Sequence, residues 1–286
     1  MRKFLVLAAI VATTLTTPAL GTAIISTGSG TAVSVTPAVT AFRTALGTLN
    51  ANVAGSFGSG RREINWDGVP GSLSAPNSLP ANFFNSNSPR GAVFSTPGSG
   101  FMVSSNAADG PIEFGNIDAT YSATFATFSA QRLFTAIGSN VLDVNFFIPG
   151  STTAAGVAGF GAIFSDVDLA NTTSIQFFDT ANNLLGTWFA PAAPSSESLS
   201  FLGVRFDAGE LVGRVRITNG NTALGTGVTD QNGNGRDLVV MDDFIFGEPV
   251  ASAVPEPDSW ALMLTGFMLM GSVLRKKRHG KNAVQH

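Results

Sequence analysis

Carboxylate and amide side chains alternate in the segment RREINWDG (61–68). If this segment is a strand, Glu63, Asn65 and Asp67 lie on one face, because alternate residues of a strand point the same way. Two carboxylates and an amide on one face suit calcium, which prefers oxygen ligands, or the hydroxyl groups of a sugar. The alternative is structural: Glu63 pairs with neighbouring arginines, and Asp67 closes a turn before Gly68.

A second pair of carboxylates lies inside an apolar run near the other end of the chain. The segment LVVMDDFIF (238–246) is apolar at both alternating sets of positions, as in a central strand that is covered on both faces. At least one of Asp242 and Asp243 should therefore point into a low-dielectric interior, where a carboxylate needs a partner. Arg61, Arg62 or a calcium ion could be that partner.

These two segments together lead to a specific hypothesis. If a strand from the N-terminal part of the domain lies beside the C-terminal strand, their carboxylates meet. We therefore expect a calcium site that combines Glu63 or Asp67 with Asp242 or Asp243.

A third polar segment, DQNGNGRD (230–237), resembles the opening of an EF-hand loop. Asp230, Asn232 and Asn234 occupy alternate positions and a glycine follows. The twelfth position, where that loop has a bidentate acid, is Met241, and no flanking helices are evident. A glycine and asparagine turn explains the segment equally well, so calcium and a plain turn remain alternatives here.

Carboxylate-dependent hydrolysis is a further possibility. A glycosidase requires two opposed carboxyl groups, and Glu63, Asp67, Glu113, Asp166 and Asp168 supply the residue type. We interpret the last two, which share a strand face, as a solvated edge. The chain has only three Trp and one Tyr, and we assign its 23 Phe residues mainly to the core.

Composition excludes several classes of function for residues 24–253. The chain has no cysteine, and its two histidines, His279 and His286, lie beyond this region. Catalysis by Ser-His-Asp or Cys-His groups, and metal binding by imidazole or thiolate, are therefore excluded there. The region has nine arginines, no lysine and 17 acidic residues, hence a net charge of −8. This charge opposes nucleic-acid binding.

The pattern of residues 24–253 predicts an all-β fold, an antiparallel jelly-roll-like β-sandwich with one short N-terminal helix. An up-and-down barrel is the main alternative. The helix is expected to begin with Thr36 as N-cap and Pro37 in its first position, and to end at Gly47. Strands are expected around 92–95, 101–104, 120–128, 141–148, 157–168, 174–179, 184–189, 198–206, 211–218 and 238–246.

The N-terminal 23 residues have the features of a Sec signal peptide. Arg2 and Lys3 precede an apolar stretch, and small residues at Ala19, Gly21 and Ala23 suit a cleavage site. The pattern predicts export through the Sec translocon.

The C-terminal segment, 254–286, combines a turn motif, an apolar run and a basic cluster. Two prolines keep the motif from being helical, residues 260–274 carry no charge, and clustered cations stay on the cytoplasmic side of a membrane. We therefore predict a stop-transfer transmembrane helix. The motif is Val254, Pro255, Glu256 and Pro257, and the cluster is Arg275, Lys276, Lys277 and Arg278.

This C-terminal arrangement resembles the PEP-CTERM (VPEP) sorting signal. The resemblance implies processing by an exosortase-type enzyme in a Gram-negative, exopolysaccharide-making bacterium. The protein would be held transiently in the inner membrane and then reach the cell surface or the biofilm matrix. Residues 24–253 also resemble an uncharacterised group of such proteins, through segments such as AFRTALG, FFNSNSPRGAVF and VVMDDFIFGEP.

We therefore predict an exported envelope or exopolysaccharide-matrix protein with a structural or binding role, and no enzymatic activity. The first alternative is a calcium-assisted, lectin-like module that binds extracellular polysaccharide. The second is a carboxylate-dependent polysaccharide hydrolase.

Overall fold

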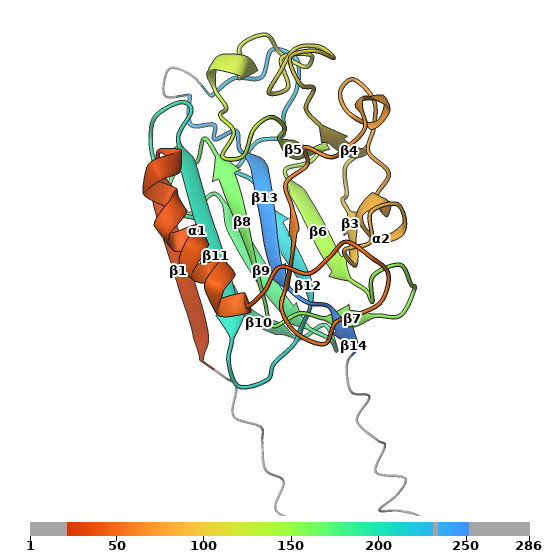
Figure 1. Cartoon of the computed structure of the whole chain (residues 1–286). Helices are drawn as coiled ribbons and strands as arrows, with labels where there is room; N and C mark the ends of the chain where they lie inside the picture. The colour runs from red at the N-terminus through yellow and green to blue at the C-terminus, as the bar shows by residue number, and fades with distance from the viewer. Residues whose placement is uncertain (1–21, 231–233, 252–286) are drawn as a thin grey trace, which may run out of the picture.

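The computed structural model describes residues 22–230 and 234–251 (Figure 1). Residues 1–21 of the predicted signal peptide (1–23) and the predicted sorting signal at 254–286 lie outside the described residues. The described chain consists mainly of antiparallel strands, so the all-β prediction is confirmed. In the same residues, no helix is long and apolar enough to cross a membrane.

Seven strands form the larger sheet. Both edges carry short or glycine-rich strands, and β13 lies near the middle, where β2 also pairs with it. The order is β1 (Ala23–Gly30), β11 (Leu199–Phe206), β8 (Gly159–Ser165), β13 (Val240–Gly247), β5 (Phe134–Ile137) and β4 (Gly100–Val103), with β2 (Arg61–Ile64) beside β13.

Five strands form the second sheet, and two short strands pair separately. The five-stranded order is β10 (Leu184–Phe189), β9 (Ser174–Asp179), β12 (Val212–Thr218), β6 (Val141–Phe146) and β3 (Ala92–Ser95). The separate pair is β14 (Val250–Ala251) with β7 (Ala155–Gly156). Short helical segments lie in the connections: η1 (Gly71–Leu73), α2 (Phe83–Ser86) and η2 (Tyr121–Ala123).

The main core contains side chains from both sheets and is rich in phenylalanine. Trp66 is fully buried in it and stacks on Phe134 with the ring centroids 4.0 Å apart. Phe84 and Phe244 meet the same indole edge-on, at 5.3 and 5.1 Å. Aromatic burial of this extent supplies much of the hydrophobic free energy of the fold.

Helix α1 (Ala32–Leu46) covers the outer face of the larger sheet, over β1 and β11 (Figure 1). Val39 and Phe42 pack there against Ile163 and Ile245. This second layer explains why β8 and β13 are apolar on both faces instead of alternating.

The predicted start of this helix was wrong by five residues. Its N-cap is Thr31, and Pro37 lies inside the helix. The hydroxyl of Thr36 does not cap the helix; it donates to the carbonyl oxygen of Ala32 at 2.7 Å. The predicted end is confirmed at Gly47, whose φ of 95° suits glycine.

Nine of the ten predicted strands are present, with β3, β9 and β10 at the predicted bounds. The strand predicted at 120–128 was wrong. That segment forms η2 and irregular chain, and its rings Tyr121 and Phe125 fill a separate small core. The sequence pattern missed β1, whose glycine and serine residues suit contact with α1: a Cβ on Gly28 would lie 3.3 Å from that of Ala38.

Candidate functional site

A β-bulge places two consecutive carboxyl groups in the protein interior. The register between β13 and β8 shifts between Met241 and Phe244, so that Asp242 and Asp243 together oppose a single residue. Their exposures are 0% and 2%, which confirms that at least one of them is buried. The indole of Trp66 donates to the Asp242 carbonyl oxygen at 2.8 Å.

Ser129 connects the two carboxyl groups. Its hydroxyl lies 2.8 Å from Asp243 Oδ1 and 3.2 Å from Asp242 Oδ1. The backbone amides of Phe128 and Ser129 donate to Asp242 Oδ2 at 2.6 and 3.3 Å. Burial, and then the charge of Asp243, raise the pKa of Asp242 well above its usual value. Burial also raises the pKa of Asp243, while Ser129 and Arg43 oppose that rise.

Of the two, Asp242 is the carboxyl group whose protonated form is favoured. Two adjacent buried carboxyls do not both ionise readily, and only Asp243 has an ion-pair partner among the described residues.

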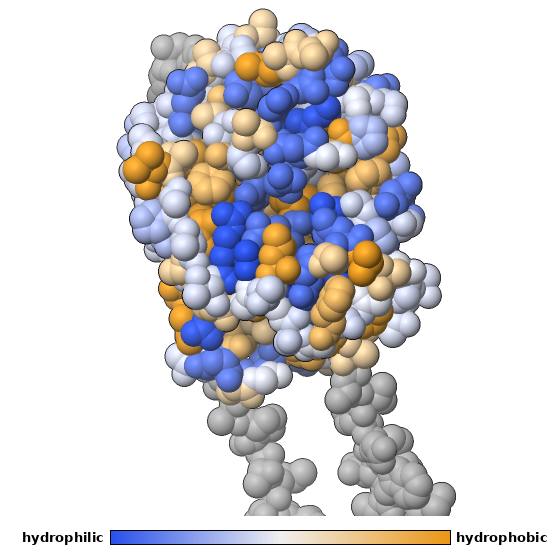
Figure 2. Space-filling view, viewed as in Figure 1, coloured by the Kyte–Doolittle hydropathy of each residue, from blue (hydrophilic) through white to orange (hydrophobic). Residues whose placement is uncertain are grey.

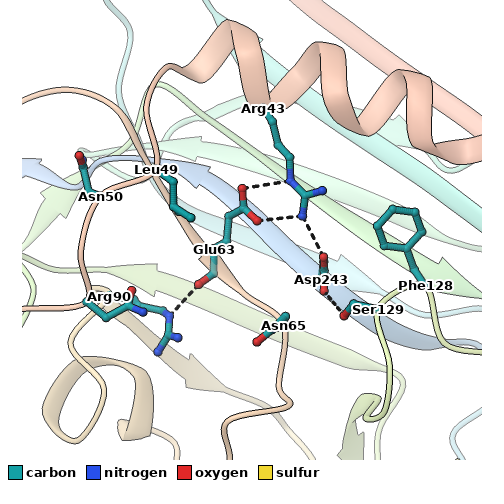
Figure 3. A pocket seen from close by; sticks show the side chains of 10 residues that line it. Arg43, Leu49, Asn50, Glu63, Asn65, Arg90, Phe128, Ser129 and Asp243 are labelled. Atoms are coloured by element: carbon teal, nitrogen blue, oxygen red, sulfur yellow. Dashed lines mark hydrogen bonds and ion pairs between the residues drawn. The ribbon is translucent and has the colours of Figure 1, made fainter.

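Arg43 of α1 bridges Glu63 of β2 and Asp243 of β13 (Figure 3). Its Nε and Nη2 donate to the two Glu63 carboxylate oxygens at 3.0 and 2.8 Å. The same Nη2 donates to Asp243 Oδ2 at 3.0 Å. Arg61 adds a bond from its Nε to Glu63 Oε1 at 2.6 Å. The expected meeting of Glu63 with Asp243 is confirmed, but a guanidinium lies where we expected calcium, and we do not propose an ion there.

These groups line a cavity of about 360 Å³. Figure 2 shows hydrophilic residues around a hollow in the middle of this face, and Figure 3 shows the cavity's side chains. Most of the lining is polar. It consists of Arg43, Leu49, Asn50, Asn52, Glu63, Asn65, Arg90, Phe128, Ser129 and Asp243.

A buried ion pair holds the wall of this cavity that contains Leu49, Asn50 and Asn52. Arg62 and Glu248 are 0% and 4% exposed, and two bonds of 2.6 and 2.8 Å join them. Glu248 also accepts from Asn50 Nδ2 at 2.8 Å. Arg62 donates to the carbonyl oxygens of residues 51, 55 and 89. One alternative had Arg62 as the partner of Asp242 or Asp243, and this was wrong. Its partner is Glu248, which was not identified from the sequence.

Asp67 is not part of the strand that carries Glu63, so the prediction that they share a strand face was wrong. The strand ends at Ile64, and Trp66 has a φ of 65°, which redirects the chain. The Asp67 carboxylate accepts from the backbone amides of Gln131 and Arg132. Burial raises its pKa.

The segment after residue 229 also differs from the expected loop. Asn234 donates to the Thr229 carbonyl oxygen at 2.7 Å and accepts from the Arg236 amide at 2.9 Å, as in a turn. Asp230 instead lies beside Asp166 and Asp168. Asp166 is 1% exposed, so its assignment to a solvated edge was wrong.

The remaining predicted site residues lie outside the described residues. They are Asn232, Val254, Pro255, Glu256, Pro257, Arg275, Lys276, Lys277 and Arg278. The chain matches no protein-family model and no curated protein sequence.

The raised pKa of Asp242 leads to a prediction about pH. A carboxyl group with a raised pKa in the folded state stabilises the fold at low pH, and that contribution is lost as pH rises from the unfolded value through the folded one. We expect Asp242→Asn to remove part of the loss of stability as pH rises above about 4, because asparagine still accepts from the two amides and cannot ionise. Urea unfolding across this range measures it. Asp207→Asn, at an exposed carboxylate, is the control, and equal slopes in Asp242→Asn and wild type would contradict the prediction.

The buried ion pair leads to a second prediction. Arg62→Met leaves Glu248 buried without its counter-charge, and we expect a loss of about 3–5 kcal/mol in the free energy of unfolding. Adding Glu248→Gln should restore part of that loss, because the uncompensated charge is then gone. Arg236→Met, at an exposed arginine, should change little. Denaturant unfolding measures all four proteins, and a cost below about 1 kcal/mol for Arg62→Met would refute the assignment.

Proposed function

We propose that this chain is an exported binding protein of the cell envelope or exopolysaccharide matrix, and that its polar cavity binds carbohydrate. The observation that carries the proposal is the lining of that cavity. Asn52 and Asn65 offer amide groups, as sugar hydroxyls require, while Asn50 is held by its bonds to Ser59 and Glu248. Leu49 and Phe128 offer apolar contact for a sugar ring. No ion is needed for this binding, which distinguishes the proposal from a calcium-assisted lectin.

Export and sorting are a second part of the proposal. The signal peptide would direct the chain to the Sec translocon, and the VPEP motif with its following helix and basic cluster would present it to an exosortase-type enzyme. Strand β1 begins at Ala23 and pairs there with Phe206. Cleavage after Gly21 would leave β1 whole, so we favour it. We also propose that the two sheets form a jelly-roll-like sandwich.

The ion pairs of Arg43 with Glu63 and Asp243 favour binding without catalysis. Glu63 and Asp243 line the same cavity, which is the observation in favour of a hydrolase. Both carboxylates bind Arg43, however, and an acid or base held in an ion pair is a poor proton carrier. We therefore place hydrolysis second.

Carbohydrate binding is tested with the full-length protein and oligosaccharides from the exopolysaccharide of the producing cells. Asn52→Ala and Asn65→Ala together should weaken binding about tenfold, since each removes about 0.5–1.5 kcal/mol of hydrogen bonding. Asn77→Ala, at an exposed asparagine that does not line the cavity, is the matched control. Equal affinity of the double variant and wild type would overturn the proposal. Turnover by wild type that Glu63→Gln abolishes would instead establish the hydrolase.

The sorting proposal is tested by cell fractionation. Deletion of Pro255, Glu256 and Pro257 should leave the protein in the inner membrane, because the processing enzyme no longer recognises it. The unaltered protein should appear at the cell surface or in the matrix. Recovery of both proteins in the cytosol, with the first 21 residues still attached, would contradict export itself.

A further inference from the structure

A second group of carboxylates lies where β8 ends and where the loop before β13 returns to the sheet. Asp166 directly follows β8, Asp168 comes two residues later, and Asp230 belongs to the loop. One carboxylate oxygen of each lies within 4.8 Å of the other two. Carboxylates from two parts of the chain that are far apart in the sequence thus lie close together.

Two oxygens of these carboxylates lack partners in the part of the chain that the structure describes. Asp166 Oδ1 and Asp168 Oδ1 are buried and have no hydrogen-bond partner there. No arginine forms an ion pair with any of the three in the described residues. A buried carboxylate without a partner is costly.

The surrounding contacts fix the positions of the three residues and leave these inner oxygens open. The backbone amide of Asp168 donates to Asp237 Oδ1 at 2.9 Å, and Thr172 donates to the other oxygen of Asp237. The Asp166 amide donates to the Ser198 carbonyl oxygen at 2.9 Å. The Leu238 amide donates to Asp230 Oδ2 at 3.2 Å. Backbone contacts therefore hold the arrangement together without an ion.

We propose that Asp166, Asp168 and Asp230 bind one calcium ion. Only oxygen atoms converge here, which selects a hard cation over the metals that prefer nitrogen or sulfur. Each oxygen lies within 4.8 Å of the other two, which is within the span of a calcium coordination shell. Calcium tolerates irregular oxygen geometry, whereas magnesium demands near-ideal octahedral geometry and loses its water reluctantly, so we favour calcium. The proposal does not depend on carbohydrate binding, because none of the three residues lines the polar cavity.

Calcium at this position would join the end of β8 to the loop before β13. It would replace the repulsion among three carboxylates with attraction to a shared ion. The bound ion should therefore stabilise the folded chain, by an amount that grows with the logarithm of one plus the ratio of free calcium to the dissociation constant.

The test is thermal unfolding and calorimetry of the full-length protein, first treated with chelator and then titrated with calcium or magnesium at constant ionic strength. At calcium about ten times the dissociation constant, we expect the unfolding temperature to rise by about 3–6 °C. Magnesium should give a smaller rise. No response to calcium up to about 10 mM would overturn the proposal, since extracellular sites bind at about 0.1–1 mM.

Variants separate this site from a general effect of calcium. Asp166→Asn should abolish the calcium response while the ion-free protein stays as stable as wild type or becomes more stable, because a source of repulsion is removed. Asp207→Asn, at an exposed carboxylate, and Asp243→Asn, at the Arg43 ion pair, should keep the full response. A calcium response that survives Asp166→Asn, or that only Asp243→Asn removes, would refute the site.

Discussion

The buried pair of Arg62 and Glu248 is the constraint on which the polar cavity depends. Arg62 belongs to β2, and Glu248 directly follows β13, so the pair joins the ends of two strands that lie side by side. Each charge is compensated by the other, and the remaining guanidinium hydrogens bind backbone carbonyls of the loop that forms the cavity wall. With Arg62 turned inward, strand alternation turns its neighbour Glu63 toward α1.

That orientation sets the order of charges across the site. Glu63, Arg43 and Asp243 alternate in sign from β2 through α1 to β13, and the pKa of Asp242, the next carboxyl, is raised by burial and by Asp243. A cation placed beside Arg43 would meet a positive neighbour, whereas an uncharged ligand rich in hydroxyl groups meets donors and acceptors at little electrostatic cost. The cavity is therefore suited to a neutral polar ligand, although its lining contains two carboxylates.

The features that could be predicted from the sequence are those that depend on the local pattern of apolar and polar residues. Apolar alternation located most strands, and the apolar surroundings of Asp242 and Asp243 predicted their burial. Prediction from the sequence failed where one backbone angle or a long-range register decides the outcome. The left-handed conformation of Trp66 separates Asp67 from Glu63, and Asp166, with φ of 69°, leaves the strand pattern in the same way. Strand alternation was assumed to continue through Trp66 and Asp166. Asp67 and Asp166 therefore could not be placed correctly from the sequence.

The same reasoning explains why calcium was expected beside Glu63 although the arrangement of charge favours another place. Sequence shows how many carboxylates and arginines a chain has, but not which ones meet. In the described structure, arginines neutralise Glu63, Asp243 and Glu248, and none forms an ion pair with Asp166. The negative charge of residues 24–253 is therefore compensated by arginine at some carboxylates and not at others. Where guanidinium groups lie, a cation has no role; where they are missing, a divalent ion can supply the charge that the folded chain lacks.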